Sequence, residues 1–105
     1  MYKRQEEAFR IAERDILHRI VEEWHREGQP PQLVACGGGT PCAFDNMEFM
    51  KSNGQVIFID TPLSTILERI RNNPHRWPLA GISNLESLYL ERRKWYEKAH
   101  ERKVP

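Results

Sequence analysis

The chain has 105 residues and a formal net charge of +1, and these values exclude several classes of protein. The length is enough for one small domain, which we expect to span residues 1–105. The nearly balanced charge argues against a nucleic-acid partner, because a protein that binds a polyanion usually has a basic excess. No apolar run approaches the roughly 20 residues of a membrane-spanning helix, and the opening "MYKRQEEAFR" is too charged for a signal peptide.

An amphipathic pattern predicts a first helix over residues 4–27. Apolar residues, Ile16 and Leu17 among them, recur at helical spacing on one side, and charged residues fill the other. Gly28 ends the helix, and the prolines in "QPP" (29–31) prevent it from resuming. Residues 32–36 are apolar and too few for a helix, so we expect a buried strand there.

Three consecutive glycines, Gly37, Gly38 and Gly39, stand directly after this predicted strand. Glycine lets a ligand or another backbone approach closely, and open α/β sheets bind ligands just beyond the carboxyl ends of their strands. We therefore expect the N–H groups of these glycines to face acceptor oxygens of a ligand; a plain flexible turn is the alternative. The run is no phosphate loop, because no lysine follows it, and it lacks the G-x-G-x-x-G spacing of a dinucleotide site.

A short helix and a second strand follow the glycines. Asp45 and Glu48 have the spacing of a reciprocal cap, which opens a helix that runs to about residue 52. Residues 55–60, "QVIFID", are β-branched and aromatic, as expected of a buried strand.

Two further helices are predicted in the last part of the chain. Thr61 and Pro62 are an N-cap and a first helical residue, and they open a helix that stops near residue 72. A loop follows over residues 75–81. A capping box then opens a last helix over about residues 84–101.

This order of elements predicts an α/β fold with a parallel sheet. We expect a three-layer arrangement with few strands, about 32–36 and 55–60, and about four helices. Two parallel strands are not stable alone, and three explanations stay open. The strands pair directly in a reduced fold, a second copy pairs with the open strand edges, or the chain is a piece cut from a longer enzyme.

Two cysteines, Cys36 and Cys42, are too few for a disulfide framework. Without a sign of secretion, we expect reduced thiols in a cytoplasmic protein, with Cys36 a small buried residue at the strand end. The histidines show no ligand spacing with one another or with the cysteines, so no metal site is predicted.

Six segments, in this order, resemble shikimate kinase, a P-loop kinase family. The resemblance rests above all on the combination of "FRxxE", "GGG" and "RxxxY" and covers about nine tenths of the chain. The segments are "AFRIAERDIL" (8–17), "VACGGGTPC" (34–42), "FDNMEFM" (44–50), "GQVIFIDTPLSTILERI" (54–70), "RWPLAG" (76–81) and "LERRKWYEKAH" (90–100).

The resemblance implies an activity and a set of site residues. The family transfers the γ-phosphoryl group of ATP to the 3-hydroxyl of shikimate, with Mg²⁺. By motif, Arg10 and Arg92 match arginines that bind the shikimate carboxylate, and the glycines at 37–39 match those that line its ring. Arg76 matches an arginine of the lid, here about residues 74–82, that closes over the phosphates, although Trp77 departs from the family pattern of arginine followed by proline.

The resemblance also implies that parts of the family are missing from this sequence. No G-x-x-x-x-G-K-[ST] motif occurs, and the family's last strand is expected to begin where the chain stops at "KVP". We interpret the chain as truncated at its N-terminal side. We expect it to be inactive alone because the sequence lacks the loop that would bind the phosphates of ATP. The alternatives are a non-catalytic binding or interaction module and an engineered minimal α/β protein. Another small-molecule P-loop kinase, of the gluconate type, lacks the "FRxxE" and "GGG" combination.

Overall fold

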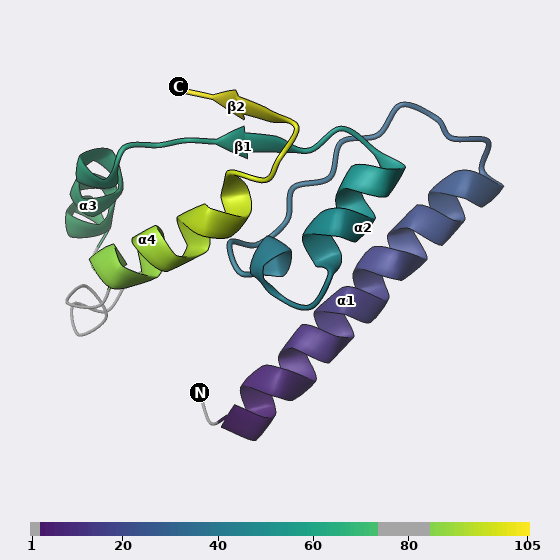
Figure 1. Ribbon diagram of the computed structural model, residues 1–105, viewed down its shortest axis with the longest axis horizontal. Helices are drawn as coiled ribbons and strands as arrows, with labels where there is room; N and C mark the ends of the chain where they lie inside the picture. Colours follow the sequence, from purple (N-terminus) through teal and green to yellow (C-terminus); the bar gives the residue numbers. More distant parts are fainter. Residues whose placement is uncertain (1–2, 74–84) are drawn as a thin grey trace. The chain divides into compact units, whose positions relative to one another are not determined.

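The structure, a computed structural model, describes residues 3–73 and 85–105. Its contacts divide the chain into two compact units, Met1–Gly54 and Gln55–Pro105 (Figure 1). In the described part of the chain, none of the helices combines the length and the hydropathy of a membrane-spanning segment.

The first unit holds a long helix, a short 3₁₀ turn and a short helix. Helix α1 (Lys3–Arg26) matches the predicted first helix, and Gly28 ends it in the left-handed conformation, with φ of 85°. The 3₁₀ helix η1 (Thr40–Cys42) follows the glycines and leads into α2 (Asn46–Asn53). Helices α1 and α2 lie side by side, with the rings of His18 and Phe49 stacked 3.8 Å apart (Figure 1).

The packing of α1 follows only part of its predicted apolar stripe. Leu17 on α1 and Met47 on α2 are buried, with 7% and 3% of their surface exposed. Ile16, which belongs to the same stripe, remains 55% exposed. The apolar stripe of α1 is therefore wider than the face that α2 and the glycine region cover.

The predicted buried strand over residues 32–36 is wrong. This segment is neither helix nor strand, Leu33 and Val34 are 94% and 48% exposed, and Cys36 is exposed rather than buried. A strand requires a neighbouring backbone for its N–H and C=O groups, and the described part of the first unit contains no strand. The apolar composition of residues 32–36 was therefore not sufficient to form a strand, because no neighbouring strand pairs with the segment in the described first unit.

The second unit is built on a parallel two-stranded sheet with two helices. Strand β1 (Ile57–Ile59) pairs with β2 (Glu101–Lys103), with Phe58 opposite Arg102. Between them in the chain lie α3 (Leu63–Asn72) and α4 (Leu85–Tyr96), and the arrows of the two strands point the same way (Figure 1). The described helices α1 to α4 and this parallel sheet confirm the predicted α/β class.

The end of the chain differs from the prediction. The last helix ends at Tyr96, not near residue 101, and a strand forms where none was expected. Its residues, "ERK", are charged and exposed, so they carry no apolar strand signal. Pairing with β1 creates β2: the Glu101 amide donates to the Val56 carbonyl (3.2 Å) and the Asp60 amide donates to the Lys103 carbonyl (2.8 Å).

Two predicted helix starts also need correction. Asp45 is the N-cap of α2 but makes no capping hydrogen bond with its side chain, and the cap of α3 is Pro62 rather than Thr61. The predicted loop over 75–81 and the lid over about 74–82 lie outside the described residues.

Candidate functional site

In the first unit, a guanidinium group lies directly against the glycines. Arg10 and Glu13 are one turn apart on α1, and their side chains form an ion pair with 3.0 Å between Arg10 Nη1 and Glu13 Oε1. The second oxygen of the carboxylate, Glu13 Oε2, accepts a hydrogen bond of 2.8 Å from the Thr40 hydroxyl. The side chains of Arg10 and Glu13 are 22% and 17% exposed, so the pair stands at the edge of solvent.

Arg10 approaches Gly39 so closely that a side chain at this position would displace the guanidinium. Its backbone has φ −87° and ψ −13°, which any residue can adopt. A Cβ atom added there would lie only 2.6 Å from Arg10 Cζ, well inside an ordinary contact. At Gly37, by contrast, an added Cβ would meet the Thr40 hydroxyl at an ordinary 3.6 Å.

We call residues 37–42 the glycine turn, and several backbone hydrogen bonds stabilise it. The Thr40 amide donates to the Gly37 carbonyl and the Cys42 amide donates to the Gly39 carbonyl, each at 3.1 Å. From α2, the side-chain amide of Asn46 donates to the Thr40 carbonyl at 2.9 Å. Gly37 and Gly38 are exposed, whereas Gly39, Thr40 and Asn46 are buried, so solvent reaches the first part of the turn.

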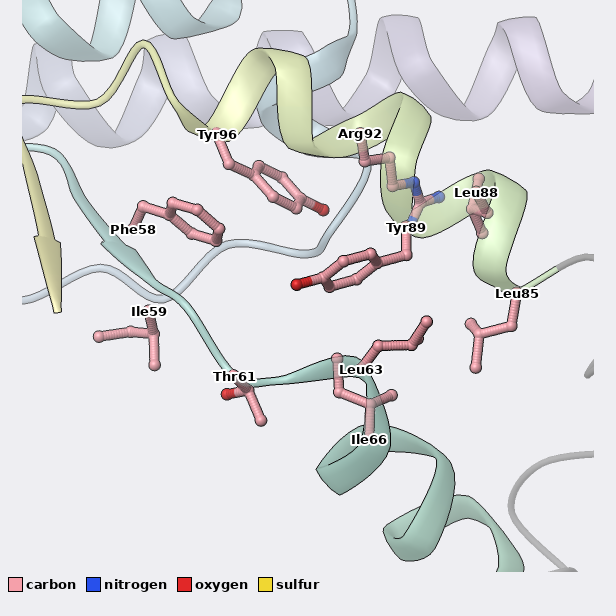
Figure 2. A pocket seen from close by; sticks show the side chains of 10 residues that line it. All are labelled: Phe58, Ile59, Thr61, Leu63, Ile66, Leu85, Leu88, Tyr89, Arg92 and Tyr96. Atoms are coloured by element: carbon pink, nitrogen blue, oxygen red, sulfur yellow. The ribbon is translucent and has the colours of Figure 1, made fainter. Parts of the chain in front are cut away.

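The second unit contains a mostly apolar pocket of about 230 Å³ that Arg92 helps to line. Figure 2 shows side chains of α4 facing those of α3 and of the segment from β1 to α3. The hydroxyl groups of Tyr89 and Thr61 supply polar atoms to this lining. The lining residues are Phe58, Ile59, Thr61, Leu63, Ile66, Leu85, Leu88, Tyr89, Arg92 and Tyr96.

The neighbouring arginine, Arg93, has a different environment. It forms a two-pronged ion pair with Asp60, at 2.7 Å and 2.8 Å, and also donates to the Tyr89 hydroxyl and to Glu97. Asp60 follows β1 directly and is 8% exposed. The hydrogen bond from Arg93 holds the pKa of the Asp60 carboxyl below its usual value, and Arg102 adds a smaller effect of the same sign. Arg93 thus fixes α4 to the end of β1.

The structure brings some of the predicted site residues together. Arg10 lies against Gly39 within the first unit, and Arg92 lines the pocket of the second unit. Arg76 lies outside the described residues.

Sequence reasoning assigned no role to three residues that hold arginine side chains. Glu13, supported by Thr40, holds Arg10, and Asp60 holds Arg93. The "FRxxE" spacing was a signal for the first, because residues three apart share a helix face. The carboxylate directly after a strand was a signal for Asp60, since strand ends in α/β folds carry functional groups.

The glycine turn does not have the sequence of a loop that binds nucleotide phosphates. The glycine turn continues into Thr40, Pro41 and Cys42, so the phosphate-binding lysine and hydroxyl of a G-x-x-x-x-G-K-[ST] loop are not supplied. Among the described residues, no group of three or more His, Cys, Asp or Glu side chains is placed to hold a metal ion.

The helices and the parallel sheet place the described chain among the α/β proteins. A family model for shikimate kinase matches residues 1–105. No solved structure matches the chain.

Curated proteins agree with the family model. The shikimate kinase of Parabacteroides distasonis is 38% identical over 85 residues, which cover 80% of this chain and 46% of that protein. The shikimate kinase of Phocaeicola vulgatus is 36% identical over 86 residues, or 82% of this chain and 46% of that protein. That of Aquifex aeolicus is 33% identical over 99 residues, or 92% of this chain and 55% of that protein.

The chain belongs to the shikimate kinase family. It spans about half the length of the curated relatives it matches.

Proposed function

We propose that this chain carries the shikimate-binding side of a shikimate kinase. The family reaction would move the γ-phosphoryl group of ATP to a hydroxyl of shikimate, and this chain would hold the acceptor. One observation supports the proposal above the others: the Arg10 guanidinium is held by Glu13 against Gly39, at the edge of solvent.

The chemistry of the first unit suits a carboxylate with hydroxyl groups nearby. A guanidinium offers donors in a planar fork that matches a carboxylate, and Arg10 uses only Nη1 for Glu13 among the described residues. The exposed glycines 37 and 38 carry no side chain that would obstruct a ring. We assign to Arg10 the carboxylate and to residues 37–39 the ring and hydroxyl groups.

The proposal gives Arg92 and Arg76 the roles that the family motif implies. Arg92 would be a second carboxylate ligand by that motif, and it lines the pocket of the second unit. Arg76 would belong to the lid over the phosphates.

We further propose that the isolated chain transfers no phosphoryl group. Catalysis of this transfer depends on a phosphate cradle and a metal ion that neutralise charge, and the 105 residues contain no G-x-x-x-x-G-K-[ST] loop. Pure chain, mixed with ATP, Mg²⁺ and shikimate, should release no more ADP than the same mixture without shikimate. Shikimate-dependent ADP release would refute this part.

The binding proposal is tested by amide NMR of the chain during titration with shikimate. Signals of residues 37–39 should shift and saturate, and Arg10→Ala should abolish the shift. Arg19→Ala is the matched control, because Arg19 is an exposed arginine on the same helix and should leave the titration unchanged. A well-dispersed spectrum that ignores shikimate would contradict the proposal and favour a non-catalytic interaction module.

We also propose that the chain associates with itself through the open edge of β1. Successive residues of a strand direct their backbone groups toward opposite edges, and Val56 and Asp60 face β2. The backbone groups of Ile57 and the amide of Ile59 therefore face the other edge, where the Ile59 carbonyl already accepts from the Thr61 amide at 3.2 Å. The side chains of Ile57 and Ile59 are 45% and 59% exposed. The other strand, β2, is entirely charged, and charged side chains protect a strand edge from pairing. Strand β1 carries no such charge.

Light scattering at several protein concentrations tests the association. Ile59→Lys places a charge on the open edge and should lower the average mass at high concentration. Val104→Lys, at an exposed site just after the charged strand, is the control and should leave the mass unchanged. A monomer at all concentrations, or the same mass for both variants, would exclude pairing at this edge.

A further inference from the structure

Two buried polar residues lie behind the arginine of the first unit. Asn46 is fully buried, and Thr40 is 3% exposed. Asn46 Nδ2 donates to the Thr40 carbonyl at 2.9 Å, and the Thr40 hydroxyl donates to Glu13 Oε2 at 2.8 Å. Glu13 Oε1 in turn accepts from Arg10 at 3.0 Å. The side chains of Thr40, Glu13 and Arg10 therefore form one hydrogen-bonded series, and Asn46 holds the Thr40 backbone at its buried end.

The series determines where the Arg10 guanidinium can be. A glutamate side chain on a helix surface has several rotamers, and an ion pair near solvent is too weak to select one of them. The Thr40 hydroxyl removes this freedom, because it fixes Oε2 and so turns Oε1 toward Arg10. The Thr40 backbone is fixed by Asn46 and by the hydrogen bonds of the glycine turn, and burial of its side chain limits the movement of the hydroxyl.

We propose that Thr40 is a positioning residue for Arg10, and that Asn46 fixes Thr40 in turn. Thr40 need not touch the ligand; its hydroxyl acts through Glu13 to orient the guanidinium toward solvent and the exposed glycines. The part of this inference that concerns shikimate rests on the proposed function. The part that concerns the order of the Arg10 side chain does not.

The role is separable from the stability of the turn. The backbone hydrogen bonds of the turn, from the Thr40 amide to Gly37 and from Ala43 to the Thr40 carbonyl, do not use the hydroxyl. Valine has the same shape and the same β-branched backbone preference as threonine. Thr40→Val therefore removes the hydrogen bond to Glu13 while the turn keeps its backbone bonds, and Thr40→Ser restores the hydroxyl.

The first readout needs no ligand. Nitrogen NMR of the arginine side chains reports rotation of the Arg10 guanidinium, which we expect to be restricted in the wild-type chain and in Thr40→Ser. In Thr40→Val the rotation should become as fast as that of Arg19, an exposed arginine on the same helix. Unchanged restriction in Thr40→Val would overturn the proposal.

The second readout compares shikimate with a cyclohexene triol that lacks the carboxylate. Thr40→Val should weaken shikimate binding about tenfold, the effect of one lost hydrogen bond to a charged group, and leave the triol unaffected. Equal losses for both ligands would mean that Thr40 only supports the fold, and would overturn the proposal.

The two readouts separate failure of the inference from failure of the proposed function. Faster rotation of the Arg10 guanidinium in Thr40→Val would support the positioning role even if the wild-type chain does not bind shikimate. In that case shikimate would be excluded as the ligand. Should Thr40→Val not fold, Glu13→Gln tests the same hydrogen-bonded series, because glutamine keeps the size of the side chain and loses its charge. Faster rotation of Arg10 in this variant would support the series, and unchanged rotation would overturn it.

Discussion

Gly39→Ala tests directly whether the glycine turn exists to admit the Arg10 guanidinium. The new Cβ would lie 2.6 Å from Arg10 Cζ, where an ordinary contact starts near 3.4 Å. The guanidinium must therefore move by about 1 Å, because helix α1 and the buried turn hold their backbones in place. This shift should disturb the 3.0 Å bond between Arg10 and Glu13, because Thr40 restrains the Glu13 carboxylate from following the guanidinium.

Two opposing effects set the expected stability of this variant. Loss of a partly exposed ion pair costs about 1 kcal/mol, which is below the value for a buried charged hydrogen bond. Alanine fits the backbone angles of Gly39 and restricts the unfolded chain, which stabilises by about 0.4–1 kcal/mol. The free energy of unfolding should therefore change by less than about 1 kcal/mol.

Binding should change much more than stability. With Arg10 displaced, affinity for shikimate should fall about tenfold, the loss expected for one charge-assisted hydrogen bond. The assays are urea unfolding and an NMR titration. Gly54→Ala is the matched control: its Cβ meets no atom within 4 Å and its backbone is extended, so binding should be unchanged. Gly39→Ala with wild-type affinity and an unmoved Arg10 signal would refute the argument.

Further predictions concern each unit separately. Leu17→Ala should destabilise the first unit by about 2–4 kcal/mol because it empties a buried site. Ile16→Ala should cost less than about 1 kcal/mol because Ile16 is exposed, and equal losses in urea unfolding would contradict the packing described. For the second unit, the lowered pKa of Asp60 means that its ion pair stabilises the fold fully above the unfolded value, roughly pH 4, and progressively less as pH falls below it. Asp60→Asn should remove this part of the acid sensitivity, as seen in unfolding midpoints between neutral and acidic pH; an unchanged pH profile would show that the Asp60–Arg93 pair is not responsible.

The strands show where the sequence was an incomplete guide. Residues 32–36 have the composition of a buried strand, yet Leu33 is 94% exposed and the segment pairs with nothing in the described first unit. The charged residues 101–103 have no strand composition, yet they form β2. A strand depends on a second backbone at the right place, and the composition of one segment does not carry that information.

At the candidate site, too, the sequence identified some features and only the folded structure identified the others. The sequence alone marked Arg10, Arg92 and the run of glycines, because their spacing follows a family motif. It did not show which glycine was needed for close approach or which of Arg92 and Arg93 was engaged by Asp60. Those answers depend on distances between residues far apart in the chain, such as the 2.7 Å between Arg93 and Asp60.

By itself, the sequence determined where α1 and α3 form and which family the chain belongs to. Periodic apolar residues and a glycine stop act over a few residues, so α1 and α3 lie close to where the pattern put them. Only the tertiary structure decided which segments pair as strands and which side chains hold Arg10 at the glycine turn. Both depend on groups that are distant in sequence and meet only when the chain is folded, as Glu13 and Thr40 do.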